Sequence, residues 1–299
     1  MKEKLKVVST CYNQENYIEQ TLQGFVMQIT NFPFEVLIVD DCSTDKTQEI
    51  ITKYANEYPD LIKPIFREKN VGSLENFIDS LSMVKSEYVA ICEGDDYWTD
   101  PLKLQRQTDF LDLNLDFSIC FHPVRIFYED GSESDKIYPG ANMIGDRKVL
   151  QLEHLLVFNF MQTNSVMYRW RFSGEESLKD IFPKDIMPGD YFLHMLHAQK
   201  GKIGMLDGVM ADYRRHKGGL WWGSTTDPVP LHLKYGVQEL KFYVEVEKRF
   251  PEWFVVRGHN HTLDAARTIF DIYLKHQRFA EIKQLLEMFP ELIVKSIPS

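Results

Sequence analysis

The residues best suited to chemistry stand in one short run, Glu93-Gly94-Asp95-Asp96, directly after the apolar segment 88–92. A continuous apolar segment of this length is typical of a parallel strand that is buried on both faces. Two adjacent carboxylates repel each other and are costly to bury, so they favour the end of a strand, where water or a cation can neutralise them. Mg²⁺ prefers carboxylate oxygen and commonly bridges protein to phosphate. The run therefore predicts a divalent-cation site, whereas an isolated Asp-Asp pair would indicate only a solvated turn.

Polar residues also follow two earlier apolar segments. Residues 5–11 lead into Tyr12 and Asn13, and residues 34–39 end at Asp40-Asp41. Apolar residues at helical spacing follow each of these segments, within 15–29 and 45–55. Strands that alternate with helices of this length are typical of a doubly wound α/β sheet, in which ligands bind beyond the carboxyl ends of the strands. We therefore expect the three polar segments to meet at one edge of the sheet.

Local signals predict the remaining elements. Asp45 and Gln48 have the spacing of a capping box, and Asp100-Pro101 is typical of an N-cap followed by the first helical residue. The apolar patterns predict a strand at 61–67, a helix at 74–81, one strand over 117–128 with a hairpin turn at 129–132, helices at 151–160 and 190–200, strands at 165–169 and 203–206, a basic, aromatic and glycine-rich loop at 213–223, and helices at 231–250, 260–275 and 278–289.

Composition limits the classes of function. The 299 residues, 44% of them hydrophobic, are enough for one large domain with an appendage, and the net charge of −10 argues against binding a nucleic-acid backbone. The N-terminus lacks the apolar stretch of a signal peptide, and no run of about 18 apolar residues could span a membrane. We expect a cytoplasmic protein that meets any lipid-borne substrate at the inner face of the membrane. The four cysteines lack metal-site spacing and are expected to be reduced thiols: Cys11, Cys42, Cys92 and Cys120.

The polar segments together resemble the family 2 glycosyltransferases. The matching pieces occur in the family's order: Val8-Ser-Thr-Cys-Tyr-Asn13, Val36-Leu-Ile-Val-Asp-Asp-Cys-Ser-Thr-Asp45, Asn70-Val-Gly72 and Glu93-Gly-Asp-Asp96. The resemblance covers roughly residues 4–220. It implies a GT-A domain over 1–224, a Rossmann-like mixed sheet flanked by helices, and leaves a helical region at 225–299 outside the family pattern.

The resemblance also implies an activity: a hexosyltransferase-like enzyme that moves a sugar, with inversion, from a nucleoside diphosphate to a hydroxyl. A UDP-sugar is the favoured donor, and the acceptor is a glycan or lipid-linked saccharide of bacterial cell-surface polysaccharide synthesis. The helical region is expected to dock a partner, and we predict a homodimer through residues 231–290.

Site residues follow from the resemblance position by position. Asp41 would accept a hydrogen bond from a nucleobase such as uracil, Asp95 would contact the ribose, and Asp96 would bind Mn²⁺ or Mg²⁺ between the two phosphates. His216 would lie beside the metal. The other residues that the resemblance assigns to the nucleotide are Thr10, Tyr12, Asn13, Glu15, Asn70, Arg214 and Arg215, the last two in a loop that closes over the pyrophosphate.

The acceptor side depends on one residue. Asp190 stands where the family has its catalytic base, although the family often has Glu-Asp there and this chain has Gly189-Asp190. Attack by a hydroxyl requires a base within hydrogen-bond reach, and a carboxylate can serve. A helix N-cap is the structural alternative for Asp190.

Several assignments have a plain structural alternative. Asp40 and Asp45 are expected mainly to shape the turn before the second helix. Asn13 and Asn70 are equally typical of turns, and the two arginines at 214 and 215 could be solvated surface charge.

Two other classes fit parts of the pattern. A sugar nucleotidyltransferase would show a glycine-rich, basic loop after the first strand, but residues 10–16 contain neither glycine nor a basic residue. A non-catalytic sugar- or partner-binding module would have no need of the Asp95-Asp96 pair or of Asp190. A haloacid-dehalogenase phosphatase would need Asp-x-Asp after the first strand, where Asn13 stands.

Overall fold

The computed structural model describes residues 3–172, 174, 177–223, 227–251 and 261–296. The chain divides into two compact units. The first comprises residues 1–155, 159–182 and 193–215, and the second comprises 156–158, 183–192 and 216–299.

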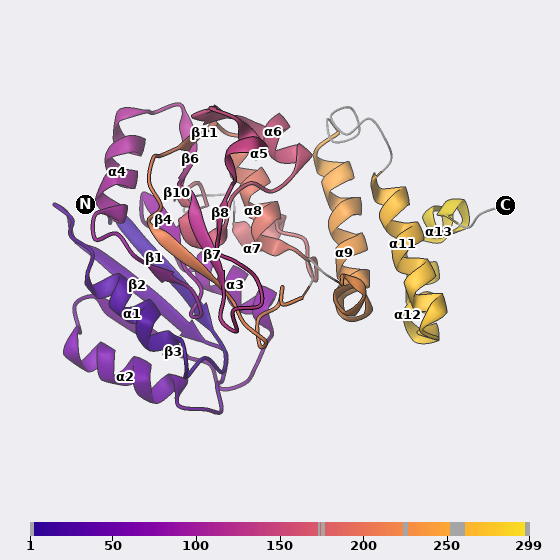
Figure 1. The fold of residues 1–299 in the computed structure, drawn as a ribbon, viewed down its shortest axis with the longest axis horizontal. Coiled ribbons are helices and arrows are strands. Elements are labelled where there is room, and N and C mark those ends of the chain that lie inside the picture. Colours follow the sequence, from indigo (N-terminus) through magenta and orange to yellow (C-terminus); the bar gives the residue numbers. More distant parts are fainter. Residues whose placement is uncertain (1–2, 173, 175–176, 224–226, 252–260, 297–299) are drawn as a thin grey trace. The chain divides into compact units, whose positions relative to one another are not determined.

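An eight-stranded mixed sheet forms the centre of the first unit, in the order β3-β2-β1-β4-β10-β6-β11-β9 (Figure 1). Its first four strands are parallel: β1 (Leu5–Cys11), β2 (Phe34–Asp40), β3 (Ile62–Phe66) and β4 (Tyr88–Ile91). The other four are β6 (Phe117–Phe121), β9 (Val149–Leu150), β10 (Met167–Arg169) and β11 (Lys202–Met205), with β10 antiparallel to both of its neighbours. The predicted α/β class is confirmed.

Helices alternate with these strands as predicted: α1 (Ile18–Val26), α2 (Thr47–Glu57), α3 (Ser73–Ser82) and α4 (Lys103–Leu113). The predicted capping box was wrong. Helix α2 begins at Thr47, and Gln48 donates its side-chain amide to Asp40 Oδ1 over 2.6 Å instead of reaching back to Asp45. The predicted start of α4 is also two residues early, since Asp100 Oδ1 accepts from the Leu102 amide over 2.8 Å in a turn before the helix.

A second sheet has the order β5-β12-β7-β8, formed by β5 (Tyr97–Trp98), β7 (Val124–Tyr128), β8 (Lys136–Tyr138) and β12 (Ala211–Arg215). The single strand predicted over 117–128 is therefore two strands in different sheets. They separate at His122-Pro123, where proline has no N–H to donate to a ladder. The predicted hairpin is confirmed by the antiparallel β7–β8 pair. The predicted loop at 213–223 was wrong in its first three residues, which belong to β12.

Close packing of α1 against β5 fixes the position of β5, the strand that directly follows Asp96. A Cβ on Gly24 would lie 2.9 Å from the Trp98 amide nitrogen, so only glycine lets the helix approach this strand. The Trp98 ring is buried edge-on against Phe25, with centroids 5.0 Å apart, and its Nε1 donates to the Asn164 carbonyl over 2.9 Å. The strand that follows Asp96 is therefore rigidly held.

The rest of the described chain is mainly helical: α5 (Ala141–Ile144), α6 (Leu152–Val157), a 3₁₀ turn at Thr163–Ser165, α7 (Leu178–Ile181) and α8 (Gly189–Ala198). The described part of the second unit contains α9 (Val229–Arg249), α11 (His261–Lys275), α12 (Phe279–Met288) and α13 (Pro290–Ser296), so helices are present where 231–250, 260–275 and 278–289 were predicted. Residues 252–260 lie outside the described residues. These helices have a core of their own around Leu240, Ile269 and Tyr273. All four cysteines are free thiols, as expected. Within the described ranges, no helix is long and apolar enough to cross a membrane.

Candidate functional site

Three polar segments meet at the carboxyl edge of the parallel strands. The Gly94 amide donates to the Thr10 carbonyl over 3.1 Å, and the Asp41 amide donates to the Cys11 carbonyl over 2.9 Å. A Cβ on Gly94 would lie 2.7 Å from the Cys11 Cβ, so glycine is required where these segments cross. The structure thus brings together the residues that follow β1, β2 and β4, as the alternation of strands and helices predicts.

Asp96 is the most unusual residue at this edge. Its side chain is 1% exposed, its Oδ1 accepts from the Arg214 amide over 2.8 Å, and its buried Oδ2 has no hydrogen-bond donor among the residues that the structure describes. Burial, followed by the charges of Asp95 and Glu93, raises the pKa of the Asp96 carboxyl well above its usual range. A cation bound at Oδ2 would neutralise the negative charge that this environment disfavours.

The surroundings of Asp96 fit Mn²⁺ or Mg²⁺. Within the described parts of the chain, no three His, Cys, Asp or Glu side chains gather in a cage of ligands. Mg²⁺ typically binds through one or two carboxylates, with phosphate oxygens and water completing its shell. The Thr21 hydroxyl, donating to the Gly94 carbonyl over 2.9 Å and to the Asp96 carbonyl over 2.6 Å, keeps the backbone of this turn in place.

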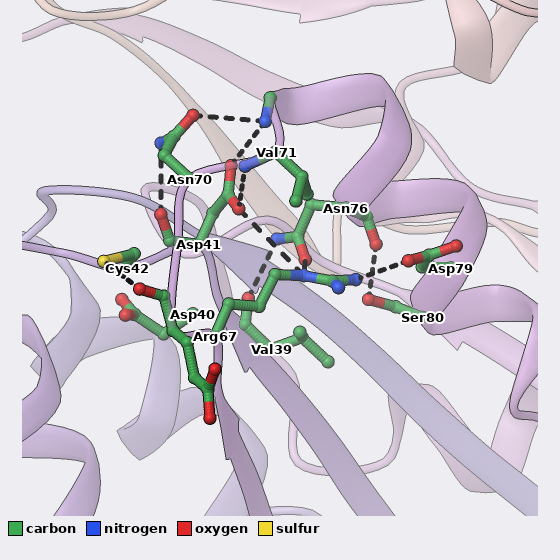
Figure 2. Close-up of polar contacts among 12 residues, drawn as sticks. Val39, Asp40, Asp41, Cys42, Arg67, Asn70, Val71, Asn76, Asp79 and Ser80 are labelled. Atoms are coloured by element: carbon green, nitrogen blue, oxygen red, sulfur yellow. Dashed lines mark hydrogen bonds and ion pairs between the residues drawn. The ribbon is translucent and has the colours of Figure 1, made fainter.

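Asp41 lies at the end of β2 in a network of backbone amides, which Figure 2 shows. The carboxylate is 2% exposed, and its two oxygens accept from the Val71 and Gly72 amides over 2.8 and 2.9 Å. Asn70 donates its side-chain amide to the Asp41 carbonyl over 3.0 Å. The Asn70-Val71-Gly72 turn, with Gly72 at φ +92°, thus holds the Asp41 carboxylate in a single orientation.

Arg67 is a site residue that the sequence reasoning missed. Its Nε donates to Asn76 Oδ1 over 2.6 Å and lies 4.0 Å from Asp41 Oδ1, and its guanidinium pairs with Asp79 over 3.2 Å (Figure 2). The available signal was its place directly after β3, beside the ends of the other parallel strands.

Asn13 joins the loop after β1 to the loop after β2. Its amide donates to the Ser43 hydroxyl over 2.8 Å, and its side-chain oxygen accepts from the Thr44 amide over 2.8 Å. Asn13 has a φ of +51°, in the left-handed region that asparagine tolerates better than most residues. The turn interpretation of Asn13 therefore holds, and direct contact with a nucleotide stays a prediction.

Glu15 makes a second connection of the same kind. Its amide donates to Asp45 Oδ2 and its carboxylate accepts from the Lys46 amide, each over 3.0 Å. Asp45 also accepts from the hydroxyl and the amide of Thr47 at the start of α2, over 2.5 and 3.0 Å. Against the effect of burial, the hydroxyl's hydrogen bond, together with those from the Glu15 and Thr47 amides, lowers the pKa of the Asp45 carboxyl. Asp40 is buried and accepts from Ser43 and Gln48. Asp40 and Asp45 thus shape this turn, as predicted.

Tyr12 extends from the same loop and is 46% exposed. An exposed aromatic ring is a suitable platform for a planar base. Thr10 is partly buried and lies in β1, one residue before the strand ends.

Arg214 and Arg215 occupy the last two positions of β12. The Arg214 side chain is 9% exposed, and its Nε donates to the Asp95 carbonyl over 3.0 Å. The Arg215 guanidinium lies over the Tyr213 ring, 5.1 Å from its centre. His216 follows in the second unit, and a Cβ on Gly218 or Gly219 would come within 3.4 Å of its imidazole. Its role beside a metal stays a prediction.

Asp190 lies in the second unit, in the first turn of α8. Partial positive charge at a helix N-terminus favours an ionised carboxylate. Its neighbour Tyr191 stacks on Phe242 of α9 with ring centroids 5.5 Å apart, and the Met187 amide donates to the Gln238 carbonyl over 3.3 Å. Helix α9 thus supports the segment that carries Asp190.

Comparison with other proteins places this geometry in context. The chain is 49% identical over 223 residues to the uncharacterised protein Rv1520 of Mycobacterium tuberculosis, a match that covers 75% of this chain and 62% of that protein. The chain thus spans about three fifths of that relative's length. Two solved structures share the fold. TarS of Staphylococcus aureus, crystallised with UDP-GlcNAc, has a TM-score of 0.58 at 20% identity, covering 98% of this chain and 79% of that one. The mannosyltransferase PcManGT of Pyrobaculum calidifontis, in complex with GDP-Man and Mn²⁺, has a TM-score of 0.61 at 13% identity, covering 99% and 86%.

The family itself is identified from the sequence of the first unit. The model of glycosyl transferase family 2 matches residues 6–174, more than half of the chain. This range contains the three strand ends, the Asn70-Val71-Gly72 turn and the Asp95-Asp96 pair described above. The chain therefore belongs to glycosyl transferase family 2.

Proposed function

We propose that this protein transfers a sugar, with inversion, from a nucleoside diphosphate to a hydroxyl of a glycan or lipid-linked saccharide. The observation that carries the proposal is the buried Oδ2 of Asp96, between β4 and β5, which has no hydrogen-bond donor among the described residues, in a chain of this family. An enzyme that holds a diphosphate through a divalent cation needs such an oxygen, whereas a simple turn would leave it solvated.

The donor side follows from the fixed carboxylates. Asp41, oriented by the Val71 and Gly72 amides, would accept an N–H of the base, while Tyr12 covers its face. Asp95 would accept from the ribose, and Asp96 would hold Mn²⁺ or Mg²⁺. When bound, such a cation neutralises the charge that develops on the leaving phosphate. Asn13, Glu15 and Asn70 would support these groups by fixing the loops.

The acceptor side requires a base. Asp190, in the first turn of α8, would accept the proton of the attacking hydroxyl, as a carboxylate within hydrogen-bond reach can. One base and one direct displacement at the sugar carbon invert its configuration. Arg215 and His216 would lie near the pyrophosphate.

A UDP-sugar is the favoured donor, and a cell-surface polymer is the favoured acceptor. The TarS structure contains UDP-GlcNAc, and TarS is named as a poly(ribitol-phosphate) β-N-acetylglucosaminyltransferase. The PcManGT complex, with GDP-Man and Mn²⁺, supports a metal but a different base. A lipid-linked acceptor would be met at the cytoplasmic face of the membrane.

The direct test is a panel of UDP- and GDP-sugars, each with Mn²⁺, Mg²⁺ or a chelator. We expect one nucleotide sugar to be hydrolysed slowly without acceptor, and its nucleoside diphosphate to stabilise the protein only when the metal is present. Stabilisation without turnover of any donor, even with glycan acceptors added, would favour a binding module instead.

The second unit is the proposed dimer contact. Its helices expose Leu274, Phe279, Leu286, Met288 and Val294, and burying such side chains favours association. Light scattering at micromolar protein should give twice the mass of one chain, and a monomer there would end this part of the proposal.

A further inference from the structure

Arg214 holds the Asp95–Asp96 turn at two points. Its backbone amide donates to Asp96 Oδ1 over 2.8 Å, and its side-chain Nε donates to the Asp95 carbonyl over 3.0 Å. One residue of β12 therefore fixes both the orientation of the Asp96 carboxylate and the peptide that precedes it. The other carboxylate oxygen, Oδ2, is left without a donor among the described residues.

Aromatic rings surround the Arg214 guanidinium. Its central carbon lies 4.9 Å from the ring centre of Tyr17, 5.4 Å from that of Tyr97 and 5.1 Å from that of Phe127. A guanidinium is planar and weakly hydrated, so it stacks on aromatic faces in a way that the compact ammonium of lysine cannot. Tyr17 directly precedes α1, and the other two rings belong to β5 and β7, so the guanidinium is a common contact for three parts of the unit.

The edges of the guanidinium point at protein acceptors. One terminal nitrogen donates to Gln20 Oε1 over 2.6 Å, and the other lies 4.0 Å from Glu129 Oε1. The second Glu129 oxygen accepts from the Tyr17 hydroxyl over 2.9 Å, which closes the ring of contacts. With only 9% of its side chain exposed, Arg214 presents little surface to a ligand.

We propose that Arg214 is a positioning residue, which sets the Asp95–Asp96 turn so that Asp96 Oδ2 faces a divalent cation, and that it is not itself a phosphate ligand. The inference rests on the proposed function, because it assumes that Asp96 binds the metal. It differs from the sequence-based expectation that Arg214 contacts the pyrophosphate, and it leaves that contact to Arg215 and His216.

The test measures Mn²⁺ affinity without nucleotide. In R214K the positive charge stays but the stacked plane and the Nε donor are lost. We expect Mn²⁺ affinity to fall ten- to a hundredfold, as is typical when the support of a metal ligand is removed, while affinity for uridine, which has no phosphate, is unchanged. R106K is the matched control. Arg106 bonds to Asp100 over 3.0 Å and to the Asp207 carbonyl over 2.8 Å, away from this turn, and R106K should bind Mn²⁺ as wild type does.

A second variant covers the case in which R214K does not fold. Gln20 is exposed, so Q20A should fold normally while freeing one edge of the guanidinium, and we expect about a threefold loss of Mn²⁺ affinity. Wild-type Mn²⁺ affinity in both variants would overturn the inference. So would an R214K protein that keeps Mn²⁺ affinity but loses affinity for UDP, because that result identifies a phosphate ligand. A wild-type protein that binds no Mn²⁺, with or without UDP, would instead refute the proposed function itself.

Discussion

At the scale of single residues, the carboxyl groups of Asp96 and Asp190 lie in two different environments. Asp96 is buried, and the neighbouring Asp95 and Glu93 carboxylates raise its pKa further. Asp190 stands in the first turn of α8, the position that the family pattern gives to a base. The first arrangement suits a group that waits for a cation, and the second suits a group that must accept a proton from an alcohol.

Replacing Asp96 with asparagine should stabilise the protein without metal. The folded-state pKa is raised, so the acid contributes stability at low pH and loses that contribution as pH rises through the folded pKa. Asp96→Asn removes the cost of ionising this buried carboxyl in the folded protein. The free energy of unfolding of the variant should therefore exceed that of wild type by an amount that grows as the pH rises. Urea unfolding between pH 4 and pH 8 checks this, with the exposed Asp60→Asn as control.

The same variant should lose its response to metal. For wild type, Mn²⁺ and UDP together at about 100 times the dissociation constant should add roughly 2.7 kcal/mol. Asp96→Asn should show the same small shift with Mn²⁺ as with chelator in thermal unfolding. Equal metal-dependent stabilisation of variant and wild type would remove Asp96 from the metal site.

Asp190→Asn should lower transfer about 10²- to 10⁴-fold, the usual contribution of a general base, and leave UDP affinity nearly unchanged, since only the transition state uses the base. The measurement is initial rate with saturating donor, paired with calorimetric titration of UDP. Proton NMR of the product should show the anomeric configuration opposite to that of the donor. Retention, or a variant within a few fold of wild type, would rule out this mechanism.

At the scale of elements, α4 carries a buried lysine that takes no part in the site. Lys103 is fully buried, donates to Gln107 Oε1 over 2.6 Å, and lies 4.2 Å from the centre of the Trp98 ring. Burial lowers the pKa of its ammonium from 10.5 to about 7. The unfolded chain therefore binds more protons than the folded one between these values, and stability should rise with pH across that window.

Lys103→Met tests this effect. A pKa difference of this size corresponds to a gain on the order of 4 kcal/mol in wild type between about pH 7 and pH 10.5. The variant should be the more stable protein at pH 7 and should lose this pH dependence. Urea unfolding at pH 7 and pH 10 measures it, and Lys53→Met, at an exposed position, should behave as wild type. Parallel pH profiles for Lys103→Met and wild type would contradict the argument.

The parallel half of the sheet could be predicted from sequence because its strands are mainly apolar and are followed by polar residues. Of the second sheet, only the β7–β8 hairpin could be predicted. Its strands are short, and β12 contains Tyr213, Arg214 and Arg215, a composition that is typical of a loop. These residues form a strand because they pair with β7, which lies far from them in the sequence. Arg67 was missed for the same reason, since its partners Asn76 and Asp79 come from the following helix. The capping role predicted for Gln48 was wrong because its side-chain amide donates instead to the buried Asp40 carboxylate.

At the scale of the whole molecule, the second unit contains both the segment that carries Asp190 and the C-terminal helices. Phe242 of α9 is buried and stacks on Tyr191, next to Asp190, and also meets Phe192 edge-on at 6.4 Å. Residues 183–192 belong to this unit although they lie far from α9 in sequence. The helices that lie outside the family match therefore support the segment that carries the candidate base.

Phe242→Leu should lower the rate of sugar transfer without changing nucleotide binding. Leucine fills much of the space but removes the ring stack, and small displacements of a catalytic group can cost about a hundredfold in rate. We expect kcat to fall ten- to a hundredfold, with UDP affinity unchanged. Tyr273→Phe is the control, because Tyr273 is buried on α11 of the same unit and its hydroxyl accepts from the Val237 amide over 3.1 Å. A kcat loss in the control as large as in Phe242→Leu would point to general loosening of the unit.

The hydrogen bonds that join Asn13 to Ser43 and Thr44, and Glu15 to Asp45 and Lys46, have a consequence for the speed of binding. Loops that are disordered must lose conformational entropy when a ligand arrives, and each immobilised side chain opposes association by about 0.5–1.5 kcal/mol. Here the two loops order one another during folding, so a nucleotide meets a surface that is already set. Its association should be limited by diffusion and charge, and differences between competing nucleotides should be expressed in how long each one stays bound.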